Sequence, residues 1–396
     1  MLSLIGTESL VNKRGSNAVG VRRYNERLIL ATVRRLDGAS KADLSRITGL
    51  SPQAAVRIVE SLAEEGRLIK AGKRTGGMGQ PSVIYRINGD SGCTIGVEIG
   101  RDRLVCTMLD FDGRIIAFDS MNIPFPSPRN AAGHIQSFTR QHMPTLRAMQ
   151  REGFLGFGIA MPWFIGEWRE EAGIATGQAA EWAVPGLEEF FQSELGGAVM
   201  FENDGNAGAL AELMSGTGVG LSNFLYIHIG NFIGGGLILN GEIVRGRNGN
   251  AGALASMPVP TGKDPDFLLH SASLYQLSSR GEAAEGPWQD WVARCADALA
   301  FTIIGANSLL DLDAVVIGGA LSQDRLQWLK DRVQERIIAT APRDFFCPDL
   351  RVGSNGARAP AIGAGLLPLF STYAPNLHSL LKSDTSSLGG DGEAGQ

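Results

Sequence analysis

Three short amphipathic segments open the chain. Apolar residues recur at helical spacing over residues 24–36. A second apolar stripe follows Ser40, an N-cap type of residue with an acidic residue three positions later, and it stops at Gly49. A third stripe starts after Ser51 and runs to about Gly66, with a proline in the first helical position. The pattern predicts three helices, with a tight turn between the second and the third.

A basic hairpin follows these helices. Residues 68–70 and 83–87 have the composition of strands, and the loop at 71–82 between them is basic and rich in glycine. Three helices and a basic hairpin are typical of a winged helix-turn-helix, in which the second helix of the motif enters the major groove. Amide and guanidinium side chains match adenine and guanine edges, and basic wing residues reach phosphates or the minor groove. The candidate DNA contacts are Ser51, Gln53, Ala54, Arg57, Lys73 and Arg74.

The remainder of the chain alternates between apolar strands and helical segments. Residues 93–112 read as two strands with a turn near 100–102, and four more segments carry recognisable patterns. These segments are GFGIAMPWFIG (156–166), FENDGNAGALAE (201–212), YIHIGNFIGGGLILNGEIVRGRNGNAGAL (226–254) and LDAVVIGGALSQ (312–323). In this order, after a winged helix-turn-helix, they resemble the ROK family of repressors, open reading frames and sugar kinases.

The resemblance implies an α/β fold of two lobes, like the actin-like and hexokinase-like ATPases, behind an α+β DNA-binding domain. We expect the winged helix-turn-helix at residues 21–88 and a sensor domain at 92–380. Its first lobe would hold about 92–203 with a C-terminal helix, and its second lobe about 204–355. Residues 1–20 form a tail without readable function, and the polar residues 383–396 are expected to be disordered.

The resemblance also suggests a ligand site. Asp204 matches the general base of the kinases, Asn203 would bond ligand hydroxyls, and Ser256 would lie in the same cleft. Helix capping is the alternative role for Asn203 and Asp204, and both roles can coexist. Trp163, Trp168 and Trp182 either stack on a sugar ring or pack in the core.

Two glycine turns stay ambiguous. Gly234–Gly236 and Gly318–Gly319 follow or separate apolar strands, so they either approach a phosphate or simply form tight turns.

The chain departs from the kinases at three motifs. An Asp-x-Gly-Gly-Thr turn that cradles phosphate is replaced by Glu98–Asp102, with Arg101 in place of a glycine. The Gly-Glu-x-Gly-His segment is Gly252–Ser256, without its glutamate and histidine, and the cysteine-rich zinc element is absent. His270 alone cannot form a zinc site, which needs about four ligands, and is expected to be a helix-surface residue. We therefore predict no kinase activity, no cofactor and no metal.

Charge separates the two parts of the chain. Residues 1–90 carry 15 Lys and Arg against 8 Asp and Glu, whereas the rest carries 21 against 33. A basic module joined to an acidic one favours a nucleic-acid reader fused to a part that does not touch nucleic acid. The four cysteines are scattered singly, and no run approaches the roughly 18 uninterrupted apolar residues of a membrane span. These features predict a cytoplasmic protein with reduced cysteines and no membrane partner.

The sequence thus predicts a transcriptional regulator, a repressor, that binds double-stranded operator DNA and responds to a sugar or a sugar-derived effector. A homodimer or homotetramer is expected, because two-fold operators mirror two-fold proteins. Two alternatives remain open. One is an active ROK-type sugar kinase with an added DNA-binding module. The other is a regulator whose degenerate sugar site has been replaced by control through a protein partner or by a scaffold role.

Overall fold

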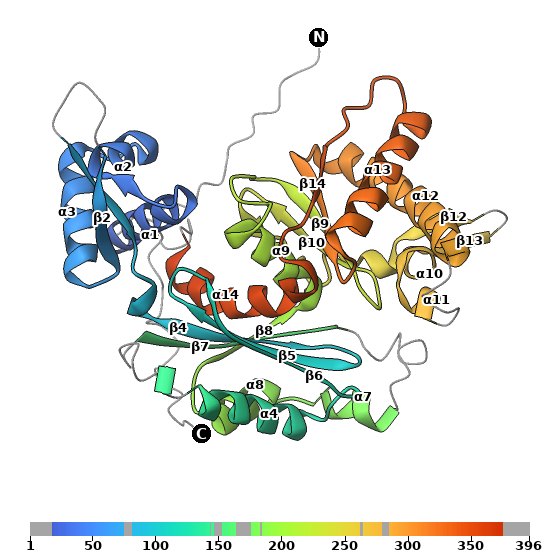
Figure 1. Cartoon of the computed structure of the whole chain (residues 1–396), viewed down its shortest axis with the longest axis horizontal. Helices are drawn as coiled ribbons and strands as arrows, with labels where there is room; N and C mark the ends of the chain where they lie inside the picture. Colours follow the sequence, from blue (N-terminus) through green and yellow to red (C-terminus); the bar gives the residue numbers. More distant parts are fainter. Residues whose placement is uncertain are drawn as a thin grey trace, which may run out of the picture. The chain divides into compact units, whose positions relative to one another are not determined.

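Two compact units divide the chain, one ending at Ile87 and taking in the chain from Tyr373, the other spanning residues 88–372 (Figure 1). We call them the N-terminal unit and the large unit. The structure, a computed structural model, describes residues 18–374 apart from 75–80, 143, 146–152, 164–175, 183, 262–263 and 279–284.

The N-terminal unit is the predicted winged helix-turn-helix. Its three helices are α1 (Ala18–Arg35), α2 (Lys41–Thr48) and α3 (Pro52–Glu64). Its sheet has the order β1-β3-β2, from β1 (Ala39–Ser40), β2 (Leu68–Arg74) and β3 (Ser82–Ile87).

Local signals explain the helix ends. Ser40 forms the predicted capping box with Asp43, and Gly49 ends α2 in the left-handed conformation at φ 71°. Two expectations need correction. The first helix begins at Ala18, before residue 24, and strand β2 continues through Arg74 because its residues keep pairing with β3 beyond a bulge. The tip of the wing lies outside the described residues.

The first sheet of the large unit has the order β6-β5-β4-β7-β8. The parallel pairs β4–β7 and β7–β8 continue the antiparallel β4–β5–β6 meander. Helices α4, α7 and α8 cover one face of this sheet, and α14 lies on the other (Figure 1). The elements are β4 (Cys93–Ile99), β5 (Arg103–Asp110), β6 (Ile115–Asn122), α4 (Pro128–Gln141), β7 (Phe154–Met161), α7 (Thr176–Trp182), α8 (Leu187–Leu195), β8 (Val199–Asn203) and α14 (Ala359–Tyr373).

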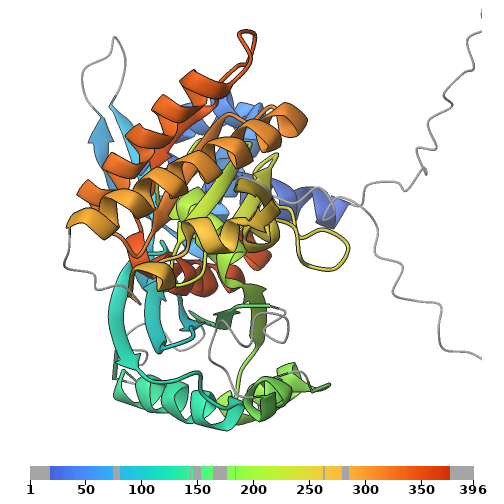
Figure 2. The same cartoon turned by 90° about the vertical axis from the view of Figure 1, so that its right-hand side faces the viewer.

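The second sheet has the order β11-β10-β9-β14-β15. Helix α9 lies on one face, and α12 and α13 lie side by side on the other (Figure 2). The elements are α9 (Asp204–Ser215), β9 (Phe224–Ile229), β10 (Gly234–Leu239), β11 (Glu242–Ile243), α10 (Leu268–Ala272), α11 (Tyr275–Ser278), α12 (Glu285–Leu310), β14 (Ala314–Gly319), α13 (Gln323–Thr340) and β15 (Asp349–Val352), with a hairpin of β12 (Pro258–Thr261) and β13 (Asp264–Phe267). Three 3-10 turns complete the described elements, at Gly89–Ser91, Leu254–Ser256 and Gly356–Arg358.

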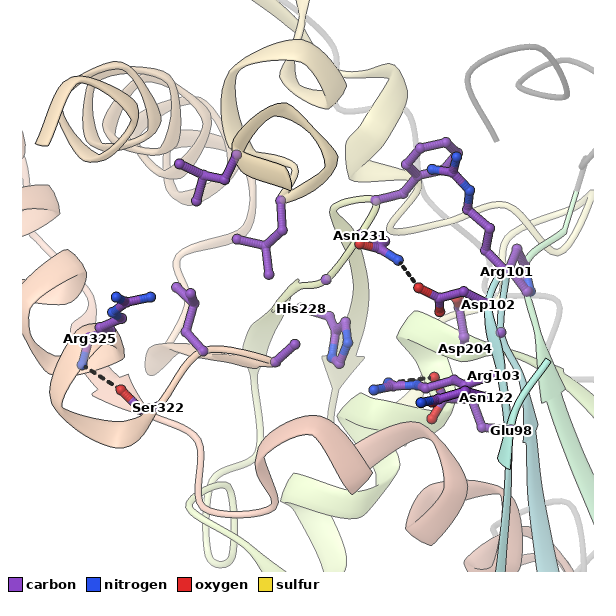
Figure 3. Close-up of a pocket in the computed structure, with 18 of the residues that line it drawn as sticks. Glu98, Arg101, Asp102, Arg103, Asn122, Asp204, His228, Asn231, Ser322 and Arg325 are labelled. Atoms are coloured by element: carbon purple, nitrogen blue, oxygen red, sulfur yellow. Dashed lines mark hydrogen bonds and ion pairs between the residues drawn. The ribbon is translucent and has the colours of Figure 1, made fainter. Parts of the chain in front are cut away.

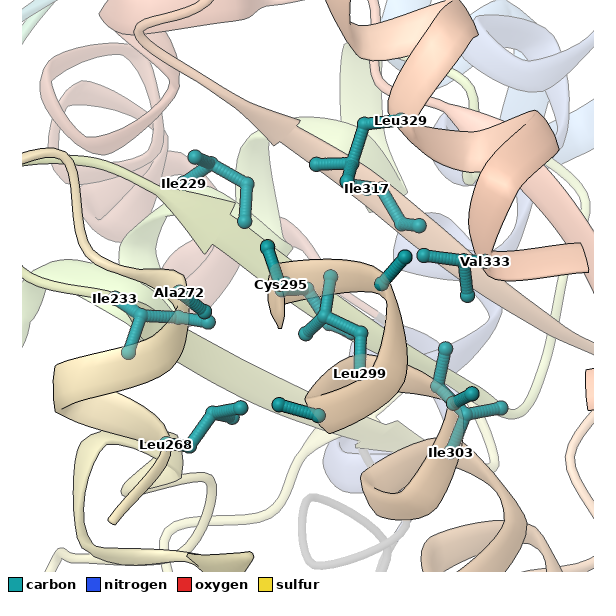
Figure 4. Close-up of a cluster of buried hydrophobic side chains, with 14 of the residues drawn as sticks. Ile229, Ile233, Leu268, Ala272, Cys295, Leu299, Ile303, Ile317, Leu329 and Val333 are labelled. Carbon is teal, nitrogen blue, oxygen red and sulfur yellow. The ribbon is translucent and has the colours of Figure 1, made fainter. Parts of the chain in front are cut away.

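Helix α12 is the central core helix of the second sheet. By length and composition, residues 286–310 are the one described helix apolar enough to cross a membrane, and half of that stretch is buried inside the protein. Cys295, Leu299 and Ile303 pack against Ile317 of β14 and Leu329 of α13 (Figure 4). The position of α12 in the core of the large unit therefore explains its apolar composition.

Glycines bring α14 and α9 into backbone contact with their neighbours. A Cβ on Gly158 of β7 would lie 1.8 Å from the carbonyl oxygen of Ala364 in α14, and one on Gly363 would lie 1.6 Å from that of Ala207 in α9. A Cβ on Gly205 of α9 would likewise lie 2.1 Å from the carbonyl oxygen of Gly235 in β10. The first sheet, α14, α9 and the second sheet therefore stack in that order at distances that side chains would not permit.

This packing corrects the interpretation of Gly234–Gly236 as a hairpin turn or phosphate loop. The three glycines begin strand β10 and pair with Tyr226–His228 of β9. The missing side chain of Gly236 leaves room for α9, since the nearest atoms to a Cβ there belong to that helix, and the missing side chain of Gly235 leaves room for Leu254.

We expect Gly158→Ala to lower the free energy of unfolding of the large unit by about 3 kcal/mol, because the added methyl group displaces α14. The matched control is Gly133→Ala in α4, where nothing lies within 4 Å of the new Cβ. That control should raise stability by up to about 1 kcal/mol through helix propensity. Denaturation followed by tryptophan fluorescence measures both, since all six tryptophans fall within residues 88–372. Equal stabilities for the two variants would contradict the packing argument.

Candidate functional site

The DNA-reading candidates lie on the first turns of α3. Ser51 is the N-cap, and its hydroxyl accepts a hydrogen bond from the Ala54 amide at 3.2 Å. Gln53 and Arg57 are exposed one turn apart, and Ala54 between them is half-buried. The buried residues of the helix are Ala55, Ile58, Val59 and Leu62. The helix therefore offers one amide and one guanidinium on a free face, the arrangement that reads base edges. Contact of these residues with DNA stays a prediction.

The two wing residues lie at the end of β2, and both are exposed. Arg74 donates to Asp43 Oδ2 at 3.1 Å, and Asp43 belongs to the capping box of α2. This ion pair ties the base of the wing to the helix-turn-helix and partly neutralises Arg74. Lys73 is the better candidate of the two for a phosphate contact.

A cavity of about 750 Å³ lies in the large unit between the two sheets. The ends of β4 and β9, the start of α9 and the start of α13 all contribute to its wall. Polar and charged side chains dominate the part shown in Figure 3. They are Glu98, Arg101, Asp102, Arg103, Asn122, Asp204, His228, Asn231, Ser322 and Arg325.

Glu98 is a buried carboxyl group on this wall. Its side chain accepts a hydrogen bond from Arg103 at 2.8 Å, and Arg103 also donates to the carbonyl of Ala357. Burial raises the pKa of Glu98 to about 6, against the lowering effect of Arg103. The side chain that corresponds to the kinase aspartate is thus engaged by an arginine of the same chain.

Asn203 and Asp204 separate into two roles. Asn203 caps α9, and its Oδ1 accepts from the amides of Gly205 and Asn206, which confirms the capping interpretation for this residue. Asp204 lines the cavity, and burial raises its pKa. The buried Glu202 fixes this turn by accepting from the Asn203 amide and from Arg245 Nε at 2.7 Å. Ligand contact by Asn203 or Asp204 stays a prediction.

His228 is a cavity residue that the sequence analysis did not single out. It is 8 % exposed on β9, and its Nδ1 lies 2.9 Å from the hydroxyl oxygen of Tyr226. Burial raises the pKa of Tyr226 and lowers the pKa of His228 to about 4, so the phenol is protonated and the imidazole is neutral at pH 7. Nδ1 is the partner that the described residues give the Tyr226 hydroxyl, so we assign the tautomer in which the phenol donates to Nδ1 and the ring proton is on Nε2. A histidine inside the apolar run FLYIHI was the available signal.

Two contacts join the loop that follows β4 to the loop that follows β9. Asn231 Nδ2 donates to Asp102 Oδ2 at 2.7 Å, and the Arg101 guanidinium lies over the Phe232 ring at 5.5 Å (Figure 3). The side chains that replace Gly and Thr in the family motif therefore bind the facing loop.

The remaining candidates lie away from this cavity. Ser256 is exposed at the end of a 3-10 turn that Leu254 anchors in the core. Trp182 is buried against Phe125 and Phe191, which fits core packing, and Trp163 is half-buried against the first-sheet core.

His270, about a third exposed on α10, pairs with Asp266. Trp168 lies outside the described residues, and among the described side chains no group of three or more His, Cys, Asp or Glu is placed to hold a metal ion.

Comparison with known proteins finds a family domain in the large unit. Residues 94–265 match the ROK family, so this chain carries a ROK family domain. A solved structure of a ROK family transcriptional regulator, a homologue of the E. coli MLC protein, matches 91 % of this chain and 99 % of its own with a TM-score of 0.63 and 17 % identity. This chain therefore shares the fold of that protein over most of its length, with three helices and a hairpin before the two-sheet unit.

Among sequence relatives, an uncharacterized protein y4fQ from Sinorhizobium fredii is 26 % identical over 88 % of this chain and 91 % of its own length. A xylose repressor from Bacillus spizizenii is 27 % identical over 57 % of this chain, a match that spans 58 % of the repressor. Glucokinases are relatives as well. Sequence similarity by itself therefore does not separate a regulator from an enzyme.

The raised pKa of Glu98 predicts a pH-dependent stability. The folded protein keeps the proton up to a pH of about 6, whereas an unperturbed glutamate loses it near 4.5, so stability falls as pH rises through this window. The shift corresponds to about 2 kcal/mol, and Glu98→Gln should gain that much over the natural protein at pH 7 and nothing at pH 4. Urea denaturation of both proteins across this range measures the difference. A difference independent of pH would show that Glu98 is not buried in this way.

Proposed function

We propose that this protein is a DNA-binding transcriptional repressor that responds to a sugar-type ligand and has no kinase activity. The observation that carries the proposal is the combination in one chain of a helix-turn-helix with Gln53 and Arg57 exposed and a ROK unit with a polar cavity of about 750 Å³. Such a volume lies in the range of small-molecule sites. The similarity to xylose repressors supports a sugar as the effector.

The absence of phosphoryl transfer rests on the loops that face each other at Asp102 and Asn231. Phosphoryl transfer needs backbone amides and a metal ion close to the phosphates. Here Arg101 and Asp102 fill that turn with side chains that bind Phe232 and Asn231, and Glu98 is engaged by Arg103. A nucleotide would have to displace these contacts.

Regulation would follow from the position of the cavity between two sheets. A ligand that binds one arrangement of the sheets better than another shifts the equilibrium between them. In a homodimer or homotetramer such a shift alters the spacing of paired recognition helices, and operator affinity changes. We propose that the protein does this in the cytoplasm, where its DNA target lies.

Gln53→Ala should weaken specific operator binding about tenfold and leave nonspecific binding unchanged, because the amide reads a base edge. Lys73→Ala should weaken binding to all sequences and reduce the slope of log affinity against log salt by about one, because it removes a phosphate contact. Anisotropy titrations with DNA from the promoter region of the protein's own gene, at several salt concentrations, measure both. Equal losses on specific and random DNA for Gln53→Ala would contradict base reading.

The same titration with D-xylose, D-glucose and their phosphates tests the sensor. We expect one neutral sugar to change operator affinity at least fivefold, and Asp204→Ala to abolish the response without changing affinity in the absence of sugar. Specific binding that no sugar changes would favour control by a protein partner.

The position of Asp204 in the cavity motivates the kinase alternative. ATP consumption that depends on a sugar and is lost in Asp204→Asn would establish that alternative.

A further inference from the structure

Glu98, a residue of the cavity wall, has one carboxyl oxygen without a hydrogen-bond partner among the described residues. The side chain is 6 % exposed, and one carboxyl oxygen, Oε1, is bonded to Arg103 at 2.8 Å. The other oxygen, Oε2, is buried and has no hydrogen-bond partner within the part of the chain that the structure describes. A buried acceptor without a partner costs free energy, which a bound donor would recover. Its place on the cavity wall makes a ligand the natural donor.

His228 offers the complementary donor from the second sheet. Its Nδ1 lies against the Tyr226 hydroxyl, and in the assigned tautomer, in which Nδ1 accepts, the neutral ring carries its proton on Nε2. Nε2 lies on the side of Gly230, another residue of the cavity wall. Figure 3 shows His228 and Glu98 on strands of the two different sheets, with the Arg103 side chain drawn between them. Glu98 therefore offers a hydrogen-bond acceptor from the first sheet, and the Nε2–H group of His228 offers a donor from the second sheet.

The charges at this end disfavour an anionic ligand. Glu98, Asp102 and Asp204 are acidic, and Arg103 is already paired with Glu98. Arg101 lies over the Phe232 ring. A phosphate would meet three carboxyl groups against two guanidinium groups that are already engaged, whereas a hydroxyl group can both donate and accept.

We propose that the Glu98–His228 end of the cavity is a hydroxyl-binding subsite for a neutral polyol. One ligand hydroxyl donates to Glu98 Oε2, and another hydroxyl oxygen accepts from His228 Nε2–H. The subsite deepens the proposed function and rests on it. It adds to the cavity two specificity-determining residues that lie outside the Asn203–Asp204 turn.

The test is calorimetric titration of the full chain with D-xylose, D-glucose, myo-inositol and D-glucose 6-phosphate. We expect at least one neutral polyol to bind and the phosphate to bind at least tenfold more weakly than glucose. Glu98→Gln and His228→Leu should each lower the affinity for the bound polyol 10- to 100-fold, the range for a hydrogen bond to a charged or buried group. His228→Gln, which keeps an N–H donor, should lose less than His228→Leu.

The matched control is Glu242→Gln, the same change on an exposed residue of β11, which should keep the affinity within twofold. Unchanged polyol affinity in both Glu98→Gln and His228→Leu would contradict the proposed subsite but not the ligand-responsive function. Tighter binding of glucose 6-phosphate than of glucose would do the same. No binding of any polyol to the natural protein would overturn the subsite together with the ligand-responsive function. Should His228→Leu fail to fold, the comparison of Glu98→Gln with Glu242→Gln decides the question.

Discussion

The large unit depends on one constraint, the approach of backbone to backbone along the stack of first sheet, α14, α9 and second sheet. Gly158, Gly363 and Gly205 stand at three successive contacts of that stack, and none has room for a methyl group. A movement of one of these elements is passed on to the next, because closely packed protein interiors are hardly compressible. The cavity lies between the two sheets that this stack joins, so its shape is tied to the position of α14 and α9.

The cavity itself holds its polar groups at a cost in stability. Burial raises the pKa of Glu98 to about 6 and lowers that of His228 to about 4, since neither charged form is well solvated there. A protein that needed only a stable core would place apolar side chains at both positions. The carboxyl group of Glu98 and the imidazole of His228 can bind the hydroxyl groups of a ligand. Their burial therefore favours a ligand-binding role of the large unit over a purely structural one.

The features that depend on neighbouring residues were predictable from the sequence. The capping box at Ser40, the Ser51 cap and Pro52 fixed α2 and α3, because each requires only three or four consecutive residues. Motif order likewise indicated the two-sheet unit. Gly235 and Gly236 were misinterpreted because they contact Gly205 of α9, a residue of another element that strand spacing does not reveal. His228 was missed because it lies in an apolar strand, and strand spacing does not show which strand residues line a cavity.

The sequence by itself determined the three helices and the hairpin of the N-terminal unit and the resemblance of the large unit to the ROK family, since local patterns carry both. Only the tertiary structure decided which polar groups share the cavity. Glu98, Asp204 and His228 come from three elements, and Ser256 and Trp182 are directed elsewhere by the packing around them. The physical reason is that burial and orientation depend on contacts between segments far apart in the chain, which one-dimensional spacing does not record.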